Sequence, residues 1–440
     1  MLNIFNSFIN KNNLCNKQET ILVTVSGGID SVVLLDLFVN ANYNIVLAHC
    51  NFKLRDDESD SDELFVKNLC EKYNIDNHFI SFDTKKYAEK NKLSIEMAAR
   101  ELRYNWFNSL CKENNYSKIA VGHHLNDSIE TIFINLTRGT GINGITGISP
   151  VNGNIIRPLL FATREQIEEY ALKNNLKYRN DSSNESTVFV RNIIRHNIIP
   201  KLKKINPSFE KTMMQNIKNL SDTAAIYNER INSITGKIVL QNNNHYKIPI
   251  SELNKLPEKQ VWLFEFLSQF GFSNAVSNNI IAGINNNCGK IFFSNTHKLL
   301  IDRKYILIEK ITDNQYQPFI IENINDFNKL PFEVSVSVVS ADNFILNKNK
   351  NIANIDLDKL KFPLTVRKWQ KGDIFYPLGM KNKKKVSDFF IDNKINRFDK
   401  NNIWIFTDAE NEIFWISGLR IDNRFKITDK TKNVIIITKH

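Results

Sequence analysis

The stretch with the clearest chemical potential is a loop of small residues, Ser26-Gly-Gly-Ile-Asp-Ser31. It lies between a β-branched run at 21–25 and an apolar run at 32–39, which predicts a buried parallel strand, a tight turn and a helix. In such a turn, backbone N–H groups converge at the positive end of a helix and favour an anion. The loop has neither the lysine of G-x-x-x-x-G-K-[ST] nor the spacing of G-x-G-x-x-G. Hydroxyls and amides without a lysine suit a pyrophosphate that will be released.

The six residues resemble the pyrophosphate-binding loop of the ATP-pyrophosphatases, which cleave ATP between the α and β phosphates to adenylate a substrate. The resemblance implies ATP and Mg²⁺ as cofactors, with Asp30 as the expected metal ligand because Mg²⁺ prefers carboxylate oxygens. A tight turn without a ligand is the alternative reading. The residues assigned to ATP binding are Ser26, Gly27, Gly28, Ile29, Asp30 and Ser31.

Strand-like and helix-like runs alternate along the first 200 residues. Residues 44–48, 78–82 and 118–122 read as further strands. This alternation predicts an α/β fold, with an open parallel sheet and helices on both faces. The second and fourth strands end at His49 and His123. Because ligands bind at the carboxyl ends of strands in such sheets, one site could collect both histidines.

Several charged residues follow the fourth strand. Asp127-x-x-Glu130 resembles a capping box in which Asp127 begins a helix, and contact with metal or phosphate from the same place stays open. His123 and His124 are adjacent at a strand end and point to opposite sides, which argues against one shared ion. Arg191 and Arg195 are four residues apart on a short helix, a spacing suited to phosphate or carboxylate, with surface ion pairing as the alternative.

Ser94 is the expected N-cap of a helix that continues to about residue 113. Its core positions are Ile95, Ala98, Leu102, Trp106 and Leu110, and its neighbouring face carries Arg100, Arg103, Tyr104 and Phe107. The glycine-rich run 138–147 reads as a mobile flap near the site or as a linker. Asp181-Ser-Ser-Asn184 reads as a turn.

Length and composition bound the class of protein. At 440 residues the chain should hold about three domains. We place their boundaries at 1–200, 201–326 and 327–440: the parallel-sheet domain, a mostly helical middle domain with a short antiparallel sheet, and an α+β domain. No apolar run is long enough to span a membrane, and the first residues lack the pattern of a signal peptide, so we expect a cytoplasmic protein. The five cysteines form no C-x-x-C pair, which argues against a zinc site, a cluster or a disulfide framework.

Positive charge is concentrated at the end of the chain. Residues 359–440 contain 18 Lys and Arg against 9 Asp and Glu, a net of +9 within a total of +11. This excess predicts a polyanionic partner, although lysine-rich composition alone is the alternative. Four aromatic residues lie beside the cations and could stack on RNA or, for the phenylalanines, form the core of a small domain: Trp369, Phe389, Phe390 and Phe425.

The whole chain resembles the bacterial tRNA(Ile)-lysidine synthetases. The motifs that carry the resemblance are Ala98–Tyr104, Gly122–Asp127 with Glu130, Arg138–Gly141, Arg157–Leu160, Asp181–Asn184, Arg191–Asn192 with Arg195, and the runs that begin at Arg367, Lys383 and Gly418. In one departure, Phe52 stands where many members have a second histidine. The resemblance implies an enzyme that adenylates C2 of the wobble cytidine of the CAU-anticodon isoleucine tRNA and joins L-lysine to it.

The resemblance also suggests roles for individual residues. The expected catalytic residues are Asp30, Arg100, Arg103, Asp127, Glu130 and Arg195, with the two acids after residue 125 as candidates to hold lysine. The expected tRNA contacts are Arg138, Arg191, Arg367, Lys368, Lys383, Lys384, Lys385, Arg420 and Arg424. Two alternatives remain, a tRNA cytidine thiolase of the same superfamily and a non-catalytic RNA-binding protein. The sequence leaves open whether the chain forms a homodimer.

Overall fold

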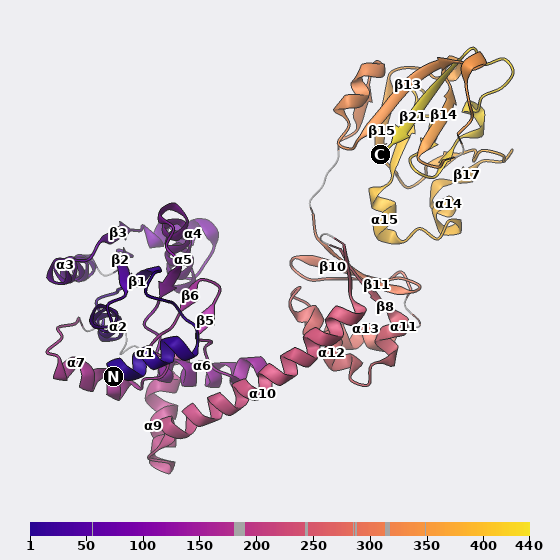
Figure 1. The fold of residues 1–440 in the computed structure, drawn as a ribbon. Helices are drawn as coiled ribbons and strands as arrows, with labels where there is room; N and C mark the ends of the chain where they lie inside the picture. The colour runs from indigo at the N-terminus through magenta and orange to yellow at the C-terminus, as the bar shows by residue number, and fades with distance from the viewer. Residues whose placement is uncertain are drawn as a thin grey trace. The chain divides into compact units, whose positions relative to one another are not determined.

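A computed structural model describes residues 1–54, 56–179, 190–242, 245–284, 286, 288–312, 317–347 and 349–440. The chain forms two compact units, Met1–Asn228 and Glu229–His440, which are treated separately below (Figure 1). The division falls within one helix, α10 (Phe209–Ile238), and the predicted boundaries after residues 200 and 326 stay predictions. The expected turn Asp181–Asn184 lies outside the described residues.

The first unit is built on a six-stranded sheet in the order β3-β2-β1-β4-β6-β5. Its neighbours pair in parallel except for β5 and β6, which are antiparallel. The strands are β1 (Thr20–Thr24), β2 (Asn44–Asn51), β3 (Asn77–Ser81), β4 (Lys118–Ala120), β5 (Val151–Asn152) and β6 (Ile155–Ile156). The predicted α/β class is therefore confirmed.

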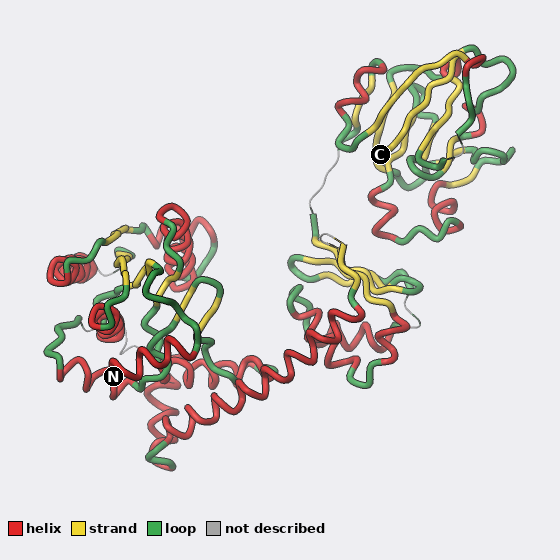
Figure 2. The backbone as a smooth tube through the Cα atoms, viewed as in Figure 1, coloured by secondary structure: helices red, strands yellow, loops and turns green. Residues whose placement is uncertain are grey.

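Helices cover both faces of this sheet because its strands are apolar on both sides. In β1, Ile21 and Val23 join the larger core cluster, whereas Leu22 belongs to a second cluster on the other face. The larger cluster contains side chains of α1 (Leu2–Lys11), α2 (Ile29–Asn40), α3 (Asp56–Tyr73) and α7 (Arg164–Lys173). The second is closed by α5 (Ile95–Asn114), and α4 (Thr84–Asn91) lies next to α5 (Figures 1 and 2).

The strand order creates a switch point between β1 and β4. From β1 the chain moves outward to β2 and β3, and it then returns to pair β4 with the other edge of β1. A crevice opens at the carboxyl ends of two strands whose connections leave in opposite directions. Gly122, just after β4, lies so close to the first turn of α2 that an added Cβ would stand 3.2 Å from the carbonyl carbon of Asp30. Only glycine allows this approach.

The helix α5 begins as predicted, with the Ser94 side chain accepting a hydrogen bond from the Met97 N–H. The prediction of its core face was partly wrong. Ile95 is 41% exposed, while Phe107, assigned to the neighbouring face, is buried against the sheet.

Helices α8 (Val190–Ile193) and α9 (Ile199–Ile205) flank a π-helical turn, η3 (Ile194–Ile198), and complete the first unit together with α6 (Leu125–Arg138) and the first part of α10. Ile194, Ile199 and Phe209 pack with side chains of α6. This packing places the helix that carries Arg195 directly beside α6, which carries Asp127 and Glu130.

The second unit begins with an antiparallel sheet, β7-β8-β11-β10-β9, and helices packed on it. The elements are β7 (Leu240–Asn242), β8 (His245–Pro249), α11 (Ile250–Lys255), α12 (Lys259–Ser268), α13 (Asn274–Gly283), β9 (Ile291–Phe293), β10 (His297–Ile301) and β11 (Tyr305–Lys310). Helices α12 and α13 are separated by a turn at Gly271, where φ is +78°.

The last part of the chain contains a five-stranded sheet, β12-β15-β18-β19-β20, a three-stranded sheet, β13-β21-β14, and the pair β16-β17. Its strands are β12 (Phe319–Ile321), β13 (Val334–Ser340), β14 (Ile352–Asp356), β15 (Leu364–Lys368), β16 (Ile374–Phe375), β17 (Lys384–Lys385), β18 (Trp404–Thr407), β19 (Ile413–Ile416), β20 (Arg420–Ile421) and β21 (Asn433–Lys439). Two helices, α14 (Val386–Asp392) and α15 (Arg397–Asn402), also belong to this part (Figure 2).

The aromatic side chains of this part are mostly core. Phe389, Phe390 and Phe425 are buried, so the idea that they stack on RNA is wrong and the core alternative holds. Among the described residues, no helix has the length and apolar character needed to cross a lipid bilayer.

A buried carboxylate ties three helices of the first unit together. Asp36 on α2 accepts hydrogen bonds from the hydroxyls of Tyr73 on α3 and Tyr170 on α7, each at 2.8 Å, and from the Asn40 amide at 2.9 Å. Because these donors would lose their acceptor, we expect Asp36→Ala to lower the free energy of unfolding by about 2–3 kcal/mol, and Tyr170→Phe by about 1 kcal/mol. Urea unfolding measures both, with exposed Glu71→Ala as control. Equal losses for Asp36→Ala and the control would contradict this account.

Candidate active site

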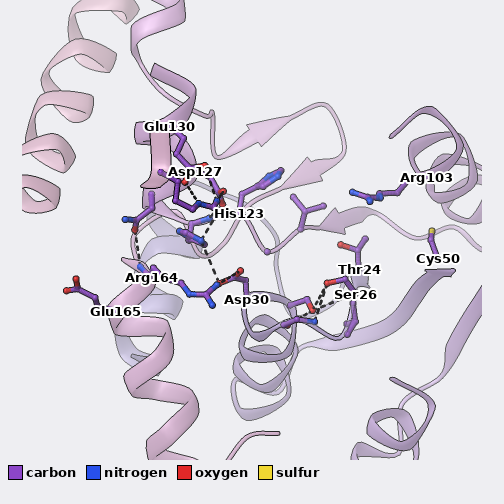
Figure 3. Close-up of a pocket in the computed structure, with 18 of the residues that line it drawn as sticks. Thr24, Ser26, Asp30, Cys50, Arg103, His123, Asp127, Glu130, Arg164 and Glu165 are labelled. Atoms are coloured by element: carbon purple, nitrogen blue, oxygen red, sulfur yellow. Dashed lines mark hydrogen bonds and ion pairs between the residues drawn. The ribbon is translucent and has the colours of Figure 1, made fainter. Parts of the chain in front are cut away.

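A cavity of about 730 Å³ opens at the switch point of the first unit. It is lined by residues that follow β1, β2 and β4 and by residues of α5, α6, α7 and α9 (Figure 3). The carboxyl ends of β1 and β4 thus meet at one site, as the strand pattern predicts. His49 is buried and does not line the cavity. Its Nδ1 lies 2.8 Å from the carbonyl oxygen of Val25.

The Ser26–Ser31 loop forms the floor of this cavity at the start of α2. Gly27 has a φ of +93°, and Gly28 is the N-cap of the helix. The hydroxyl of Ser31 donates to the carbonyl oxygen of Gly28 at 2.8 Å and accepts from the backbone N–H of Ser26 at 3.2 Å. The two serine hydroxyls lie 3.3 Å apart. The loop is therefore held by its own side chains in a compact turn at the positive end of a helix, where an anion is favoured.

The Asp30 carboxylate is paired with Arg164, a residue that no sequence motif indicated. Nη1 of Arg164, the first residue of α7, donates to both Asp30 carboxylate oxygens at 3.2 and 3.0 Å (Figure 3). His124 Nε2 lies 3.7 Å from the same carboxylate. Burial raises the pKa of Asp30 above its ordinary value, and the charges of His124 and Arg164 offset only part of that effect.

Asp127 closes the start of α6 from inside the helix. The helix begins at Leu125 with His124 as its N-cap, so Asp127 does hold the helix start through a capping box, but together with His124 rather than with Glu130. From the third helical position, Asp127 accepts a hydrogen bond from the His124 N–H at 3.0 Å. Burial opposes ionisation, but His124, His123 and this backbone N–H together hold the pKa of Asp127 below its ordinary value.

Glu130 is fully occupied by two arginines. Its side chain is 1% exposed, and Arg195 binds it with two hydrogen bonds, from Nε at 2.6 Å and Nη2 at 3.1 Å. Arg191 Nε lies 3.3 Å from the same carboxylate. The i, i+4 arginine pair therefore holds a carboxylate rather than a phosphate here. Burial raises the pKa of Glu130, and Arg195 counteracts the rise.

His123 and His124 turn to different partners. His123 Nδ1 accepts a hydrogen bond from Arg157 Nε at 3.2 Å, and Arg157 Nη1 donates to the Ser149 carbonyl at 2.7 Å. An arginine has no acceptor, so neutral His123 must carry its proton on Nε2. Burial lowers the pKa of His123 to about 4; Asp127 opposes this shift, while Arg157, Arg191 and Arg100 add to it. His123 thus presents a neutral ring to the cavity.

Comparisons with known proteins match this chain along its whole length. Residues 2–202 match the PP-loop domain family, residues 241–311 the TilS substrate binding domain and residues 364–437 the TilS substrate C-terminal domain. A tRNA(Ile)-lysidine synthase of Parabacteroides distasonis is 40% identical over 439 residues, 99% of either chain. This chain belongs to the tRNA(Ile)-lysidine synthase family. Enzymes of the same name from Bacteroides thetaiotaomicron, 40% identical over 98% of this chain and 97% of that one, and Porphyromonas gingivalis, 37% identical over 93% and 91%, agree.

Another part of the cavity lining in this family member is formed by an arginine and an aromatic ring. There, the Arg103 guanidinium lies 5.0 Å from the centre of the Phe52 ring, and both residues line the cavity. The Phe52 ring, at the position where many family members have a histidine, therefore lies against the guanidinium of Arg103. Arg100 is exposed, lies over the Tyr104 ring and is not among the described lining residues. No residue of the run 138–147 is among the described lining residues, and the Asn135 amide of α6 donates to the Gly144 carbonyl, so the flap prediction finds no support here.

The expected tRNA contacts of this family member divide into paired and unpaired cations. Arg367 forms two hydrogen bonds with Asp373, at 2.9 and 2.8 Å, and Arg424 pairs with Asp422 and Glu412. Lys384 pairs with Asp392, and Lys368 lies over the Trp404 ring, where burial lowers its pKa to about 8. Arg191 pairs with Glu130. The described residues offer no ion-pair partner to the remaining four: Arg138, Lys383, Lys385 and Arg420.

Sequence reasoning missed a charged cluster on the far wall. Lys203 of α9 pairs with Glu165 at 3.0 Å and with Glu210, and all three residues line the cavity. Glu165 is 38 residues from Lys203, and the three residues belong to no short motif. Arg164 follows Thr163, which with Gln166 forms the capping box of α7, so only the start of this helix was readable from the sequence.

The hydrogen bond from Arg157 predicts the protonation of His123. We expect neutral His123 in the Nε2–H form at pH 5.5–8, since its pKa is about 4. In Arg157→Met we expect the pKa to rise toward the ordinary value of about 6.5, because a nearby positive charge is removed. NMR of the ¹⁵N-histidine-labelled chain, assigned with His123→Gln, measures both. A wild-type His123 that titrates near 6.5, or carries its proton on Nδ1, would contradict the assignment.

Proposed function

We propose that this enzyme converts the wobble cytidine of the CAU-anticodon isoleucine tRNA into lysidine. The C2 oxygen of the cytidine attacks the α-phosphorus of ATP and pyrophosphate leaves. The amine of L-lysine, the ε-amine by family resemblance, then attacks C2 and AMP leaves with the former C2 oxygen. The observation that carries the proposal is a pyrophosphate loop at a switch-point cavity, in a chain that matches lysidine synthases from end to end.

The loop would hold the leaving pyrophosphate. Ser26 and Ser31 line the cavity at the N-terminus of α2, and the loop contains no lysine to retain the product. Asp30 has the hard oxygen ligands that Mg²⁺ requires, and the Arg164 guanidinium now lies against them, so a cation is compatible with this position. Bound Mg²⁺ would supply charge neutralisation at the phosphates.

Fixed positive charge near the reacting phosphate would stabilise the transition state. Arg195 and Arg103 both line the cavity and are the candidates for this role. Arg195 is held by Glu130 and cannot rotate freely, which gives it the preorganisation that electrostatic catalysis needs. Arg100 acts at most indirectly, through the field that it adds near His123.

Asp127 is the better candidate of the two acids for the lysine ammonium. Both oxygens of Glu130 already accept from Arg195, whereas Asp127 lines the cavity with a pKa that keeps it charged. The tRNA would be held by unpaired cations, among which Lys383, Lys385, Arg138 and Arg420 remain our candidates. ATP and tRNA are both cytoplasmic, and we propose that location; a homodimer remains a prediction.

The thiolase alternative lacks a suitable thiol. Cys50 lines the cavity, but burial raises its pKa to about 12, so it would remain a protonated thiol at neutral pH. Cys70 and Cys111 are buried, and burial raises the pKa of each to about 11. Membership of a family of enzymes also argues against the second alternative, a non-catalytic RNA-binding protein.

A single assay tests the reaction. Purified full chain, MgATP, labelled lysine and a transcript of the CAU-anticodon tRNA should give labelled tRNA, with AMP and pyrophosphate released in equal amounts. A matched transcript with uridine at the wobble position should remain unlabelled. Release of ADP and phosphate, or label in the uridine control, would refute the proposed chemistry.

Asp30→Asn should separate chemistry from RNA binding. Because the amide cannot balance the charge of a cation, we expect lysine incorporation to fall about 10²–10³-fold, in the range typical of lost electrostatic catalysis. The tRNA dissociation constant should change less than about threefold, within roughly 0.7 kcal/mol. Glu169→Gln, on an exposed position of α7, is the control and should match wild type. Lost tRNA binding with intact ATP cleavage would reverse the assignment.

A further inference from the structure

A second cavity, of about 610 Å³, lies in the last part of the chain and has no role in the reaction above. Its walls come from two edge strands, β14 of the three-stranded sheet and β20 of the five-stranded sheet. The cleft therefore opens where the two sheets end beside each other. Its volume is within the ~300–1,000 Å³ that small-molecule-sized groups occupy in proteins.

The interior of this cleft is apolar. Phe344, Leu346, Ile352, Leu419 and Ile421 line it, and Phe344 is only half-buried, so its ring is available for contact. Leu346 is 60% exposed, an unfavourable arrangement for a large aliphatic side chain unless something covers it.

One buried polar atom on the wall lacks a partner. Asn354 is 6% exposed, and its amide nitrogen donates to the Asn347 carbonyl at 2.8 Å. Its Oδ1 accepts no hydrogen bond from the described residues. An unsatisfied buried acceptor costs free energy, and a donor from a bound group, directly or through a trapped water, would recover it.

Positive charges surround the opening. Lys350, Arg420 and Lys426 line the cleft, and the described residues place no ion-pair partner beside any of them. This differs from Arg367 and Arg424 nearby in the sequence, whose carboxylate partners are close. An occupant should therefore be flat and apolar, carry a hydrogen-bond donor, and bear negative charge outside.

We infer that this cleft takes one unpaired nucleotide of the tRNA, with its base between the two sheets and its phosphates against Lys350, Arg420 and Lys426. The base must be unpaired because a base in a helix cannot enter a pocket, and proteins commonly read splayed bases by such contacts. The exocyclic amino group of adenine or cytosine offers the donor that Asn354 lacks. The inference rests on the proposed function, since it assumes tRNA as substrate.

Photo-crosslinking tests this assignment on the full chain. We place p-benzoyl-phenylalanine at Phe344, irradiate with the unmodified CAU-anticodon transcript and map the adduct by primer extension. We expect adducts at one or a few unpaired nucleotides. The Lys350→Glu/Arg420→Glu pair should remove most of the adduct and weaken tRNA binding about tenfold or more. The Lys394→Glu/Lys430→Glu pair changes the net charge equally at exposed positions outside the cleft and should lose far less.

The outcomes separate this inference from the proposed function. Three results would overturn the cleft assignment while lysine incorporation persists. They are adducts spread along helical stems, no adduct despite tight tRNA binding, and a protein–protein adduct of doubled mass. Equal losses in the two charge-reversal pairs would also overturn it, because binding would then follow net charge alone. Failure of lysine incorporation in the wild-type assay would instead refute the proposed function.

Discussion

The close approach of β4 to the first turn of α2 is the constraint on which the site depends. Gly122 lies against the backbone of Asp30 and Ser31, and backbone atoms cannot move aside as a flexible side chain could. The residues that follow each strand therefore meet at one point, with the serine hydroxyls on one side and the two histidines on the other. A methyl group at residue 122 would meet the Asp30 carbonyl carbon at 3.2 Å and would require β4 and the first turn of α2 to move apart by a few tenths of an ångström.

The charges of the cavity are balanced in pairs. Asp30 has Arg164, Glu130 has Arg195, and Asp127 has the His124 N–H and ring. In a partly buried site an unpaired charge is costly, and each pair holds the other member in a defined orientation. A ligand that enters such a site replaces one partner of a charged side chain. The free-energy cost of burying that side chain is therefore already offset by its partner in the folded protein.

The sequence predicted what short segments determine. The tight turn at Ser26–Ser31, the N-cap at Ser94 and the parallel sheet follow from local patterns, and the structure has all three. Pairing between distant segments was not readable. Nothing near Arg164 in the sequence points to Asp30, 134 residues away, and Arg367 looks like a free cation until the fold brings Asp373 against it. Burial was misjudged for the same reason. Ile95 and Phe107 are both apolar residues of one helix, and only the packing of that helix on the sheet decides which of the two side chains is buried.

The contact between Arg164 and Asp30 has a consequence for the order in which ligands arrive. A guanidinium that leaves a carboxylate in a cavity needs another anion close by, and a polyphosphate provides one, whereas a bare divalent cation only competes for the same oxygens. If the proposed site holds Mg²⁺ and ATP, free Mg²⁺ should thus be a poor first ligand, and the cation should enter already attached to the nucleotide. Arg164 would then act as an internal counter-ion of Asp30 that makes the enzyme without substrate insensitive to the concentration of free metal.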